Sequence, residues 1–333
     1  MSRSPQTGSA EDRLIARYFA PLARHPGAMG LTDDAAVLTP PDGSDLVLTN
    51  DTIIAGVHFF PDDAPDAVAR KALRVNLSDL AAKGAEPAGF LLSLALPPDA
   101  TEQWLAALAL GLRTDADRYG CPLLGGDTVR TPGPATISIT AFGLVPRGAM
   151  VLRSGAKAGA AVLVTGTIGD AALGLRLRRD PAAATRWGLD RPMREHLLAR
   201  YLVPEPRNAI AVAVRAASAA MDVSDGLAGD LAKLCRVSGV SAEVEVARVP
   251  LSDAARTALA AEPSLIEAIL TGGDDYEIVC TAPPERVAAL QAACTAGGVA
   301  LTEIGRVGAG EGTRFIAPDG RVLTFAQPSF SHL

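Results

Sequence analysis

The 333 residues of this chain exceed what one hydrophobic core usually serves, so the length predicts two domains. The composition, 48% hydrophobic with only 4% aromatic residues, is typical of a well-packed α/β enzyme and not of an interaction scaffold. A net charge of −6 without a basic stripe argues against binding to nucleic acid. No apolar run approaches the roughly 18 residues of a membrane span, and residues 1–10 lack an apolar signal segment, so we expect a cytoplasmic protein without membrane contact.

The first half of the chain is predicted to begin with a flexible tail over residues 1–10, which are rich in Ser, Pro, Gly and Thr. Apolar residues at helical spacing predict helices, and short apolar or alternating runs predict strands. The expected elements are a helix over 12–23, a strand over 45–49, a helix over 66–83, a strand over 90–96, a helix over 101–119 and a strand over 135–145.

The helix predicted over residues 66–83 places a carboxylate in an unusual position. Asp79 falls in its last turn, where the helix dipole disfavours an anion, so it needs either Lys83 or a metal as a partner. Gly84 is a plausible end of the helix. The buried stripe is predicted to be Leu73, Leu77 and Leu80, and the flank beside it to be Ala72, Asn76, Asp79 and Lys83.

The second half restarts after a glycine-rich stretch over residues 147–159, where we place the domain boundary. The predicted domains are therefore 11–148 and 149–333, two lobes of α/β (α+β) type with mixed sheets, the second being a sheet with packed helices. Its expected strands are 161–165, 219–223, 242–246, 277–281 and 300–304. One expected helix starts at Ala171, and two others cover 227–237 and 285–296.

The four cysteines form no Cys-x-x-Cys pair and have no histidine at zinc-finger spacing. Cys280 and Cys294 lie in or near apolar segments and are interpreted as small core residues. Signatures of other chemistries are missing as well, because the sequence contains no Gly-Lys dipeptide of a P-loop, no His-Arg-Asp loop, no Gly-x-Ser-x-Gly and no His-Glu-x-x-His. With four histidines in all, a histidine-rich metal site is not expected.

Aspartates at glycine-rich or polar breaks between apolar runs are the main candidates for chemistry. Mg²⁺ prefers oxygen ligands and is usually held by one or two carboxylates plus substrate phosphates. Clustered carboxylates without cations would raise one another's pKa, so the set predicts several metal ions and a polyphosphate if the acids converge. The set is Asp33, Asp34, Asp51, Asp79, Asp127, Asp222, Asp225, Asp274 and Asp275.

Each of these residues also has an ordinary structural interpretation. Asp225 before Gly226 fits a common turn. Arg130 and Arg153 are either phosphate clamps or members of surface ion pairs. His58 is either a satisfied, half-buried imidazole or a substrate contact. The run 272–277, Gly-Gly-Asp-Asp-Tyr-Glu, is harder to explain structurally, because two adjacent acids at the start of a strand are costly without a counter-charge.

Motifs in consistent order over nearly the whole chain resemble those of thiamine-monophosphate kinases, within the aminoimidazole-ribonucleotide synthetase-like ATP-binding superfamily. The run Asn-Leu-Ser-Asp-Leu-Ala-Ala and the His-Phe pair after Asp51 separate this family from its purine-biosynthetic relatives. The resembling segments are 32–35, 49–52, 56–59, 76–85, 125–128, 153–156, 164–166, 221–227 and 272–277.

The resemblance implies ATP-dependent phosphorylation of thiamine monophosphate to thiamine diphosphate with several Mg²⁺ ions. It implies an N-terminal domain that binds ATP and Mg²⁺ and forms, with a second subunit, a β-barrel in a homodimer, and a C-terminal domain that completes the nucleotide and substrate site. The implied metal ligands are Asp34, Thr49, Asn50, Asp51, Asp79, Asp127, Asp222 and Asp225. Implied ATP contacts are Gly126, Asp127, Arg153 and Ser224, the catalytic set is Asp51, Asp127, Asp222 and Arg153, and the substrate contacts are His58, Asp274, Gln327 and Phe330.

The chain departs from the family pattern at three places. Thr32 stands where the family usually has Gly, and Asp274 where it usually has Glu. Gln327 or Phe330 takes the place of a Trp expected against the substrate ring. The alternatives to this function are another ATP-using member of the superfamily, a Mg²⁺-dependent phosphatase, and a cation-binding structural protein. A selenide-handling relative is disfavoured because no cysteine precedes Cys121.

Overall fold

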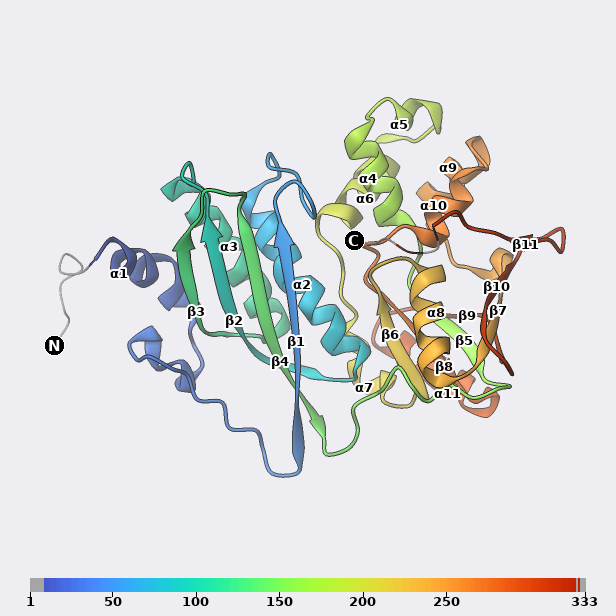
Figure 1. Ribbon diagram of the computed structural model, residues 1–333, viewed down its shortest axis with the longest axis horizontal. Coiled ribbons are helices and arrows are strands. Elements are labelled where there is room, and N and C mark those ends of the chain that lie inside the picture. Colours follow the sequence, from blue (N-terminus) through green and yellow to red (C-terminus); the bar gives the residue numbers. More distant parts are fainter. Residues whose placement is uncertain (1–8, 328, 330–333) are drawn as a thin grey trace. The chain divides into compact units, whose positions relative to one another are not determined.

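The computed structural model describes residues 9–327 and residue 329, which fall into two compact units (Figure 1). The first contains the described residues up to Leu80 and Glu86–Gly148, and the second contains Ala81–Ala85 and the described residues from Ala149 onward. Most of the predicted tail, residues 1–8, lies outside the described part. Within that part, no helix is both long enough and apolar enough to cross a bilayer.

The first unit is built around a four-stranded sheet in the order β1-β4-β2-β3. Strand β4 runs antiparallel to β1 and β2, while β3 runs parallel to β2. Its elements are α1 (Ala10–Leu14), a π-helical turn (Ile15–Phe19), 3-10 turns (Ala20–Leu22 and Pro26–Leu31), β1 (Ser44–Ile54), α2 (Pro65–Ala82), β2 (Glu86–Leu96), α3 (Glu102–Tyr119), β3 (Leu123–Arg130) and β4 (Thr136–Pro146).

Helices α2 and α3 lie behind this sheet in Figure 1 and cover one face of it. Strand β4 alternates buried residues such as Ile137 and Ile139 with half-exposed ones such as Ser138, as predicted. The predicted stripe of α2 is buried, and Gly84 follows the helix with a φ of +71°. Thr101 caps α3 by accepting a hydrogen bond from the Trp104 N–H.

Three expectations for the first unit were wrong in part. Strand β1 continues to Ile54, because β4 pairs with it along its whole length, so Asp51 lies inside the strand and not at its end. Residues 125–128, expected at a break, belong to β3, which pairs with β2. The N-terminal helix is irregular because Pro21 has no N–H to donate to the carbonyl of Arg17.

The second unit is built around a seven-stranded sheet in the order β11-β10-β7-β9-β5-β8-β6, in which only the β10–β7 pair is parallel. Both sheets of the described residues are open, so neither closes into a barrel. The elements are β5 (Ala161–Thr165), α4 (Asp170–Arg179), α5 (Ala183–Arg186), α6 (Arg191–Leu202), α7 (Ala211–Val214), β6 (Ala219–Val223), α8 (Leu227–Ser238), β7 (Ser241–Glu245), α9 (Asp253–Ala261), α10 (Leu265–Thr271), β8 (Glu277–Ala282), α11 (Pro284–Ala296), β9 (Leu301–Gly308), β10 (Gly312–Ile316) and β11 (Val322–Leu323).

Strand β5 is buried on both faces, which explains its uninterrupted apolar sequence. Val162 and Val164 belong to a core shared with α8, and Leu163 belongs to a core shared with α11. All four cysteines are buried and free, so the interpretation of Cys280 and Cys294 as core residues is confirmed. Burial raises the pKa of Cys280 to about 12. Helices α5, α6, α7, α9 and α10 and strands β10 and β11 were not predicted.

Candidate active site

In the first unit, α2 and β1 bring two predicted acids to one polar seam. The Oγ1 of Thr49 donates a hydrogen bond to Asp79 Oδ2. Asn76 is fully buried; its Oδ1 accepts a hydrogen bond of 3.0 Å from the backbone N–H of Asp51, and its Nδ2 donates to the Ala72 carbonyl. The predicted flank of α2 therefore faces the inner side of β1, and Asn76 is a site-organising residue to which the sequence analysis assigned no role.

Asn50 does not join this seam. Successive side chains of a strand point to opposite faces, so Asn50 lies on the other side of β1 from Thr49 and Asp51. Its Nδ2 donates to the Thr140 Oγ1 at 2.8 Å and to the Ile139 carbonyl at 3.1 Å. The structure thus brings the side chain of Asn50 to β4 and not to the neighbouring acids.

A pocket of about 760 Å³ within the first unit gathers a second group of predicted residues. Apolar side chains such as Phe19, Leu91 and Phe142 form most of its lining. The polar residues of its wall are Asp33, Asp34, Ser93, Asp127, Thr128 and Thr140, and Gly126 also lines it. The predicted metal ligands Asp34 and Asp127 and the predicted ATP contacts Gly126 and Asp127 therefore share a pocket whose volume is in the usual range for small-molecule sites.

Gly126 is required by the packing of this pocket wall. A Cβ at this position would lie 1.9 Å from the carbonyl oxygen of Leu92 on β2. At neighbouring Gly125, a Cβ would meet only the Cδ2 of Leu91, at 3.3 Å. The unusual Thr32 fits its place, because its φ of −109° suits any residue, and the left-handed conformations fall on Met29, Gly30 and Leu31 instead.

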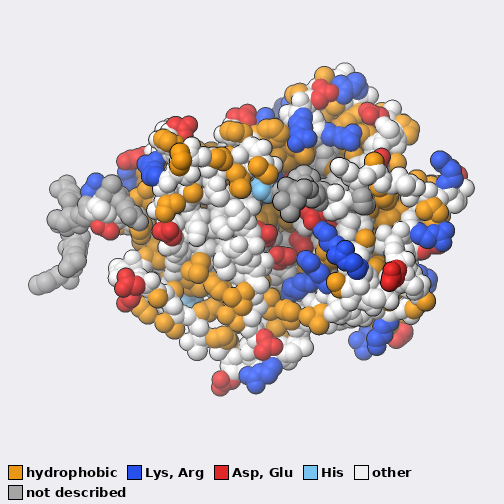
Figure 2. Space-filling model, viewed as in Figure 1, with side chains coloured by type: hydrophobic (Ala, Val, Ile, Leu, Met, Phe, Trp, Pro, Cys, Tyr) orange, Lys and Arg blue, Asp and Glu red, His pale blue; other side chains and the backbone are white. Residues whose placement is uncertain are grey.

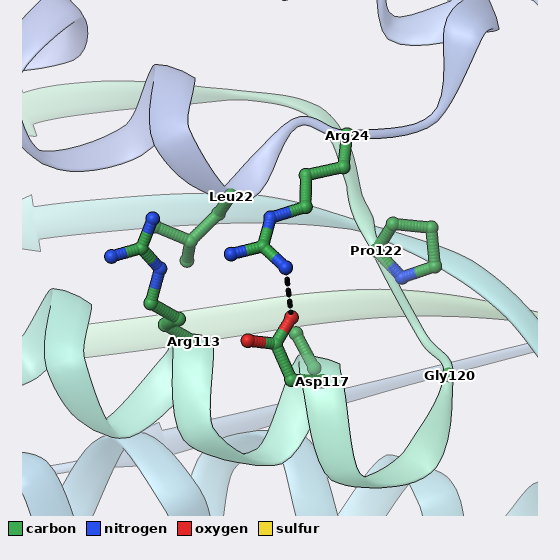
Figure 3. Close-up of a pocket in the computed structure, with 7 residues that line it drawn as sticks. Leu22, Arg24, Arg113, Asp117, Gly120 and Pro122 are labelled. Atoms are coloured by element: carbon green, nitrogen blue, oxygen red, sulfur yellow. Dashed lines mark hydrogen bonds and ion pairs between the residues drawn. The ribbon is translucent and has the colours of Figure 1, made fainter.

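A smaller pocket of about 210 Å³ in the same unit contains none of the predicted site residues. Figure 3 shows Arg24 directed toward Asp117, with Nη1 2.9 Å from Oδ1, and Arg113 beside them. The Arg24 and Asp117 side chains are 57% and 49% exposed, so this is a surface ion pair. The larger pocket is the better candidate for a nucleotide.

In the second unit, three predicted residues lie in and just after β6: Asp222 is buried within the strand, and Ser224 and Asp225 are in the turn that leads to α8. Lys233 Nζ lies 2.5 Å from Asp225 Oδ2 and 2.8 Å from Asp230 Oδ1. Burial raises the pKa of Asp230 even though Lys233 donates to it. The charge of Asp225 is therefore already balanced by Lys233, and a cation at Asp225 would compete with this ammonium group.

The segment 272–276 is attached directly to this turn. The Asp274 N–H donates to the Ser224 carbonyl at 2.9 Å, and the Tyr276 N–H donates to the Val223 carbonyl at 2.8 Å. A Cβ on Gly273 would lie 2.4 Å from the Ser224 carbonyl oxygen, so the approach needs glycine. A predicted substrate residue, Asp274, and a predicted ATP contact, Ser224, are thus neighbours.

Comparison with known proteins identifies the family of this chain. Residues 32–145 match the family described as AIR synthase related protein, N-terminal domain, and residues 157–317 match AIR synthase related protein, C-terminal domain. Over 303 residues, 90% of this chain and 84% of the relative, the sequence is 45% identical to the thiamine-monophosphate kinase of Caulobacter vibrioides. This chain belongs to the thiamine-monophosphate kinase family.

Solved structures of thiamine-monophosphate kinases share the fold. The enzyme from Stenotrophomonas maltophilia superposes with a TM-score of 0.82 at 40% identity, covering 94% of this chain and 96% of that one. A structure described as AaThiL complexed with AMPPCP and TMP superposes with a TM-score of 0.77 at 32% identity, covering 90% of this chain and 91% of that one.

The remaining residues implied by the kinase resemblance occupy varied settings. His58 is half-buried, with its Nδ1 accepting a hydrogen bond from the Ile54 N–H at 3.1 Å. Arg153 is exposed, and its carbonyl accepts from Ser238. Arg130 is exposed and donates to the Pro97 carbonyl at 3.1 Å. Gln327 is exposed, whereas Phe330 lies outside the described residues.

Among residues 9–327 and 329, no three His, Cys, Asp or Glu side chains gather in the manner of a metal cage. The predicted metal-ligating side chains along the α2–β1 seam and at the pocket wall all offer oxygen atoms to a metal ion. Such sparse oxygen sets fit Mg²⁺, which is usually bound by one or two carboxylates and completed by substrate phosphates and water. The chemistry of the donors is therefore compatible with the metal implied for a thiamine-monophosphate kinase.

Proposed function

We propose that this chain catalyses the transfer of the γ-phosphoryl group of ATP to thiamine monophosphate, giving thiamine diphosphate and ADP. The observation that carries the proposal is the 45% identity to a thiamine-monophosphate kinase over 90% of the chain. It is supported by the fold shared with a relative complexed with AMPPCP and TMP. A phosphate oxygen of thiamine monophosphate attacks the γ-phosphorus, and the bond from that phosphorus to the β–γ bridging oxygen breaks.

The reaction needs no strong general base, because the second pKa of a phosphate monoester is about 6 and its oxygen is already anionic at neutral pH. The main obstacle is repulsion between the two anions, which costs about 4 kcal/mol per unit-charge pair at about 4 Å and an effective dielectric near 20. Bound Mg²⁺ supplies the positive charge that offsets this repulsion. The proposed ligands are Thr49, Asp51 and Asp79 along the seam, Asp34 and Asp127 at the pocket, Asp222 at the end of β6 and Asp225 in the turn that follows it. Asn50 is not among them, because its side chain is bonded to β4 on the other face of β1.

For the nucleotide, we propose the pocket of the first unit. Its apolar walls suit a base, and its acidic side, with Asp34 and Asp127, suits metal-bound phosphates. Gly126 leaves its backbone accessible there, while Arg153 and Ser224 of the second unit are proposed as further ATP contacts. His58, Asp274 and Gln327 are proposed to contact thiamine monophosphate, with Phe330 as an additional aromatic contact.

We further propose a homodimer in which the first units of two copies complete a β-barrel. The outer face of the four-stranded sheet is exposed and carries Leu48, Leu91 and Val129, which are 59%, 36% and 49% exposed. Figure 2 shows hydrophobic side chains gathered over part of this unit. A matching face on a second copy would cover them. The four free, buried thiols support a cytoplasmic location.

The test is an assay of the purified protein with ATP, Mg²⁺ and thiamine monophosphate, with all products separated by chromatography. We expect equal amounts of thiamine diphosphate and ADP, formed only when Mg²⁺ is present. Free phosphate without thiamine diphosphate would identify a phosphatase instead. ATP binding without transfer to thiamine monophosphate would assign the chain to another reaction of the superfamily.

A further inference from the structure

The segment that carries Asp274 is held in a conformation that residues other than glycine adopt rarely. Asp274 has a φ of +72° and Tyr276 a φ of +51°. Such left-handed conformations cost free energy and persist only where the surroundings enforce them. In this chain they occur beside the turn after β6, so the contacts that enforce them are of functional interest.

The first enforcing contact is made by Asp275, which is completely buried. Its Oδ2 accepts a hydrogen bond of 2.7 Å from the Gly169 N–H, and its Oδ1 accepts one of 3.2 Å from the Ala171 N–H. These N–H groups belong to the first turn of α4 and have no partner within the helix. Both carboxyl oxygens of Asp275 therefore anchor the segment to the start of α4.

The second enforcing contact comes from Arg200 on α6. Its Nη2 donates to the backbone carbonyl of Asp275 and to Glu277 Oε1, each at 2.9 Å. Glu277 is completely buried and also accepts from Arg207 Nε at 2.6 Å and from Thr165 Oγ1 at 2.7 Å. Arg200 is therefore held in place by a buried carboxylate and in turn holds the peptide unit that follows Asp275.

The opposite edge of the segment is bound to the turn after β6 through the Asp274 and Tyr276 N–H groups. The segment is thus clamped between α4 and α6 on one side and the turn with Ser224 on the other. These contacts fix the backbone from which the Asp274 side chain projects. Asp275 and Arg200 therefore hold the segment in this conformation, although neither residue is assigned a contact to ATP, Mg²⁺ or thiamine monophosphate.

We propose that Asp275 and Arg200 are positioning residues that hold Asp274 in its left-handed conformation and thereby set the affinity for thiamine monophosphate. The proposal rests on the function proposed above, since it takes Asp274 as a substrate contact. Small displacements of such a contact are expected to reduce binding and transfer on the order of 100-fold. The affinity for ATP should be affected much less.

The experiment compares the full chain with Asp275→Asn, which keeps one acceptor but turns an NH₂ group toward a backbone N–H. Hydrogen–deuterium exchange of peptides covering 272–277 is measured together with KM for thiamine monophosphate and for ATP. The matched control is Asp115→Asn, which breaks a buried ion pair of the first unit where Arg74 Nε lies 2.6 Å from Asp115 Oδ2 and both side chains are 0% exposed.

In Asp275→Asn we expect faster exchange over 272–277 and a rise in KM for thiamine monophosphate of about 10- to 100-fold, with KM for ATP within about 3-fold of wild type. Asp115→Asn should lower the Tm without either change. Wild-type exchange and wild-type KM in folded Asp275→Asn would overturn the proposal, as would an equal rise of both KM values.

If Asp275→Asn does not fold, Arg200→Lys replaces it, because lysine keeps the charge beside Glu277 but not the planar guanidinium whose Nη2 donates both to Glu277 and to the Asp275 carbonyl. The same exchange and KM pattern is expected, and its absence contradicts the proposal. A wild-type protein that forms no thiamine diphosphate would contradict the proposed function alone. The exchange measurement would then still decide whether Asp275 holds the segment.

Discussion

Asn76 on α2 accepts a hydrogen bond of 3.0 Å from the backbone N–H of Asp51 on β1. Strand β1 is an edge strand of the sheet formed by the described residues, and on that edge the amide side chain accepts the hydrogen bond that a neighbouring strand would otherwise accept. This bond fixes the position of Asp51 along the seam relative to Asp79. One buried neutral residue thus sets the relative position of two carboxylates that are 28 positions apart in sequence.

Replacing this amide should disturb both stability and turnover. Asn76→Leu has similar volume but removes the acceptor of the half-buried Asp51 N–H, which costs about 1 kcal/mol. We expect a lower free energy of unfolding and a marked loss of kcat. Thr52→Val, on the outer and exposed face of the same strand, is the control and should change neither quantity by much. Denaturant unfolding and the kinase assay measure the two effects.

Removing a charge from the seam should weaken the proposed use of Mg²⁺. For Asp51→Asn and Asp79→Asn we expect losses of about 10- to 100-fold or more in kcat at ordinary Mg²⁺, partly restored at higher Mg²⁺ concentration. The Tm should change little in comparison. Asp117→Asn removes an equal charge from the exposed ion pair with Arg24 and serves as the control. Full activity in the seam variants at low Mg²⁺ would remove these residues from the metal site.

The two adjacent glycines of β3 should respond very differently to alanine. Gly126→Ala places a methyl group 1.9 Å from the Leu92 carbonyl oxygen, so β2 and β3 must separate locally. We expect a loss of about 1–3 kcal/mol in stability and a raised KM for ATP. Gly125→Ala meets only a flexible leucine methyl at 3.3 Å and should stay close to wild type. Similar behaviour of both variants would speak against the pocket as the nucleotide site.

Asp170 should contribute to stability in a pH-dependent way. Its burial acts to raise the pKa, but donation by His196, Ser252 and Thr167 outweighs this and leaves the pKa below its ordinary value. A carboxyl whose folded pKa is lowered stabilises the fold above its unfolded pKa, about 3.9, and this contribution is lost as the pH falls through the folded pKa.

We therefore expect Asp170→Asn to lower the free energy of unfolding at pH 7 and to reduce its decline on acidification below about pH 4. Asp180→Asn is a suitable comparison, because donation by Arg186 lowers the pKa of Asp180 as well, yet its side chain is exposed. Solvent screening should make that variant indistinguishable from wild type. Urea unfolding at pH 7, 5 and 3.5 would decide between the two behaviours.

A charge on the outer sheet face should separate the proposed dimer. Leu48→Asp places a carboxylate on the outward face of β1, opposite Phe142 of β4, so it would be buried without a partner in the assembly. We expect light scattering to report a dimer for wild type and a monomer for the variant, with the secondary structure of each copy unchanged. Lys157→Asp, on an exposed loop of the second unit, should leave the assembly intact. A monomeric wild-type protein would contradict the dimer.

Much of the fold could be predicted because local sequence carried a strong signal. The bounds of β5 and β6 are those predicted, since both strands are buried on two faces and are apolar except for Thr165 and Asp222. The motifs also predicted that Asp51, Asp79 and Asp274 belong to a site, which stays a prediction. In each case the physical information lies within a few neighbouring residues.

Tertiary structure decided the rest, because it depends on partners remote in sequence. Strand β3 contains two glycines and exists because β2 lies beside it, and β1 is extended because β4 pairs with it to the end. Because β1 continues as a strand past Thr49, its side chains keep alternating between the two faces, and this places Asn50 on the outer face. The adjacent acids Asp274 and Asp275 were expected to be costly without a counter-charge, and the partners of Asp275 are the N–H groups at the start of α4. The neighbouring buried Glu277 is paired with Arg200 and Arg207, which are far from it in the chain but adjacent in the fold. A buried charge is stable only with such partners, and only folding brings them together.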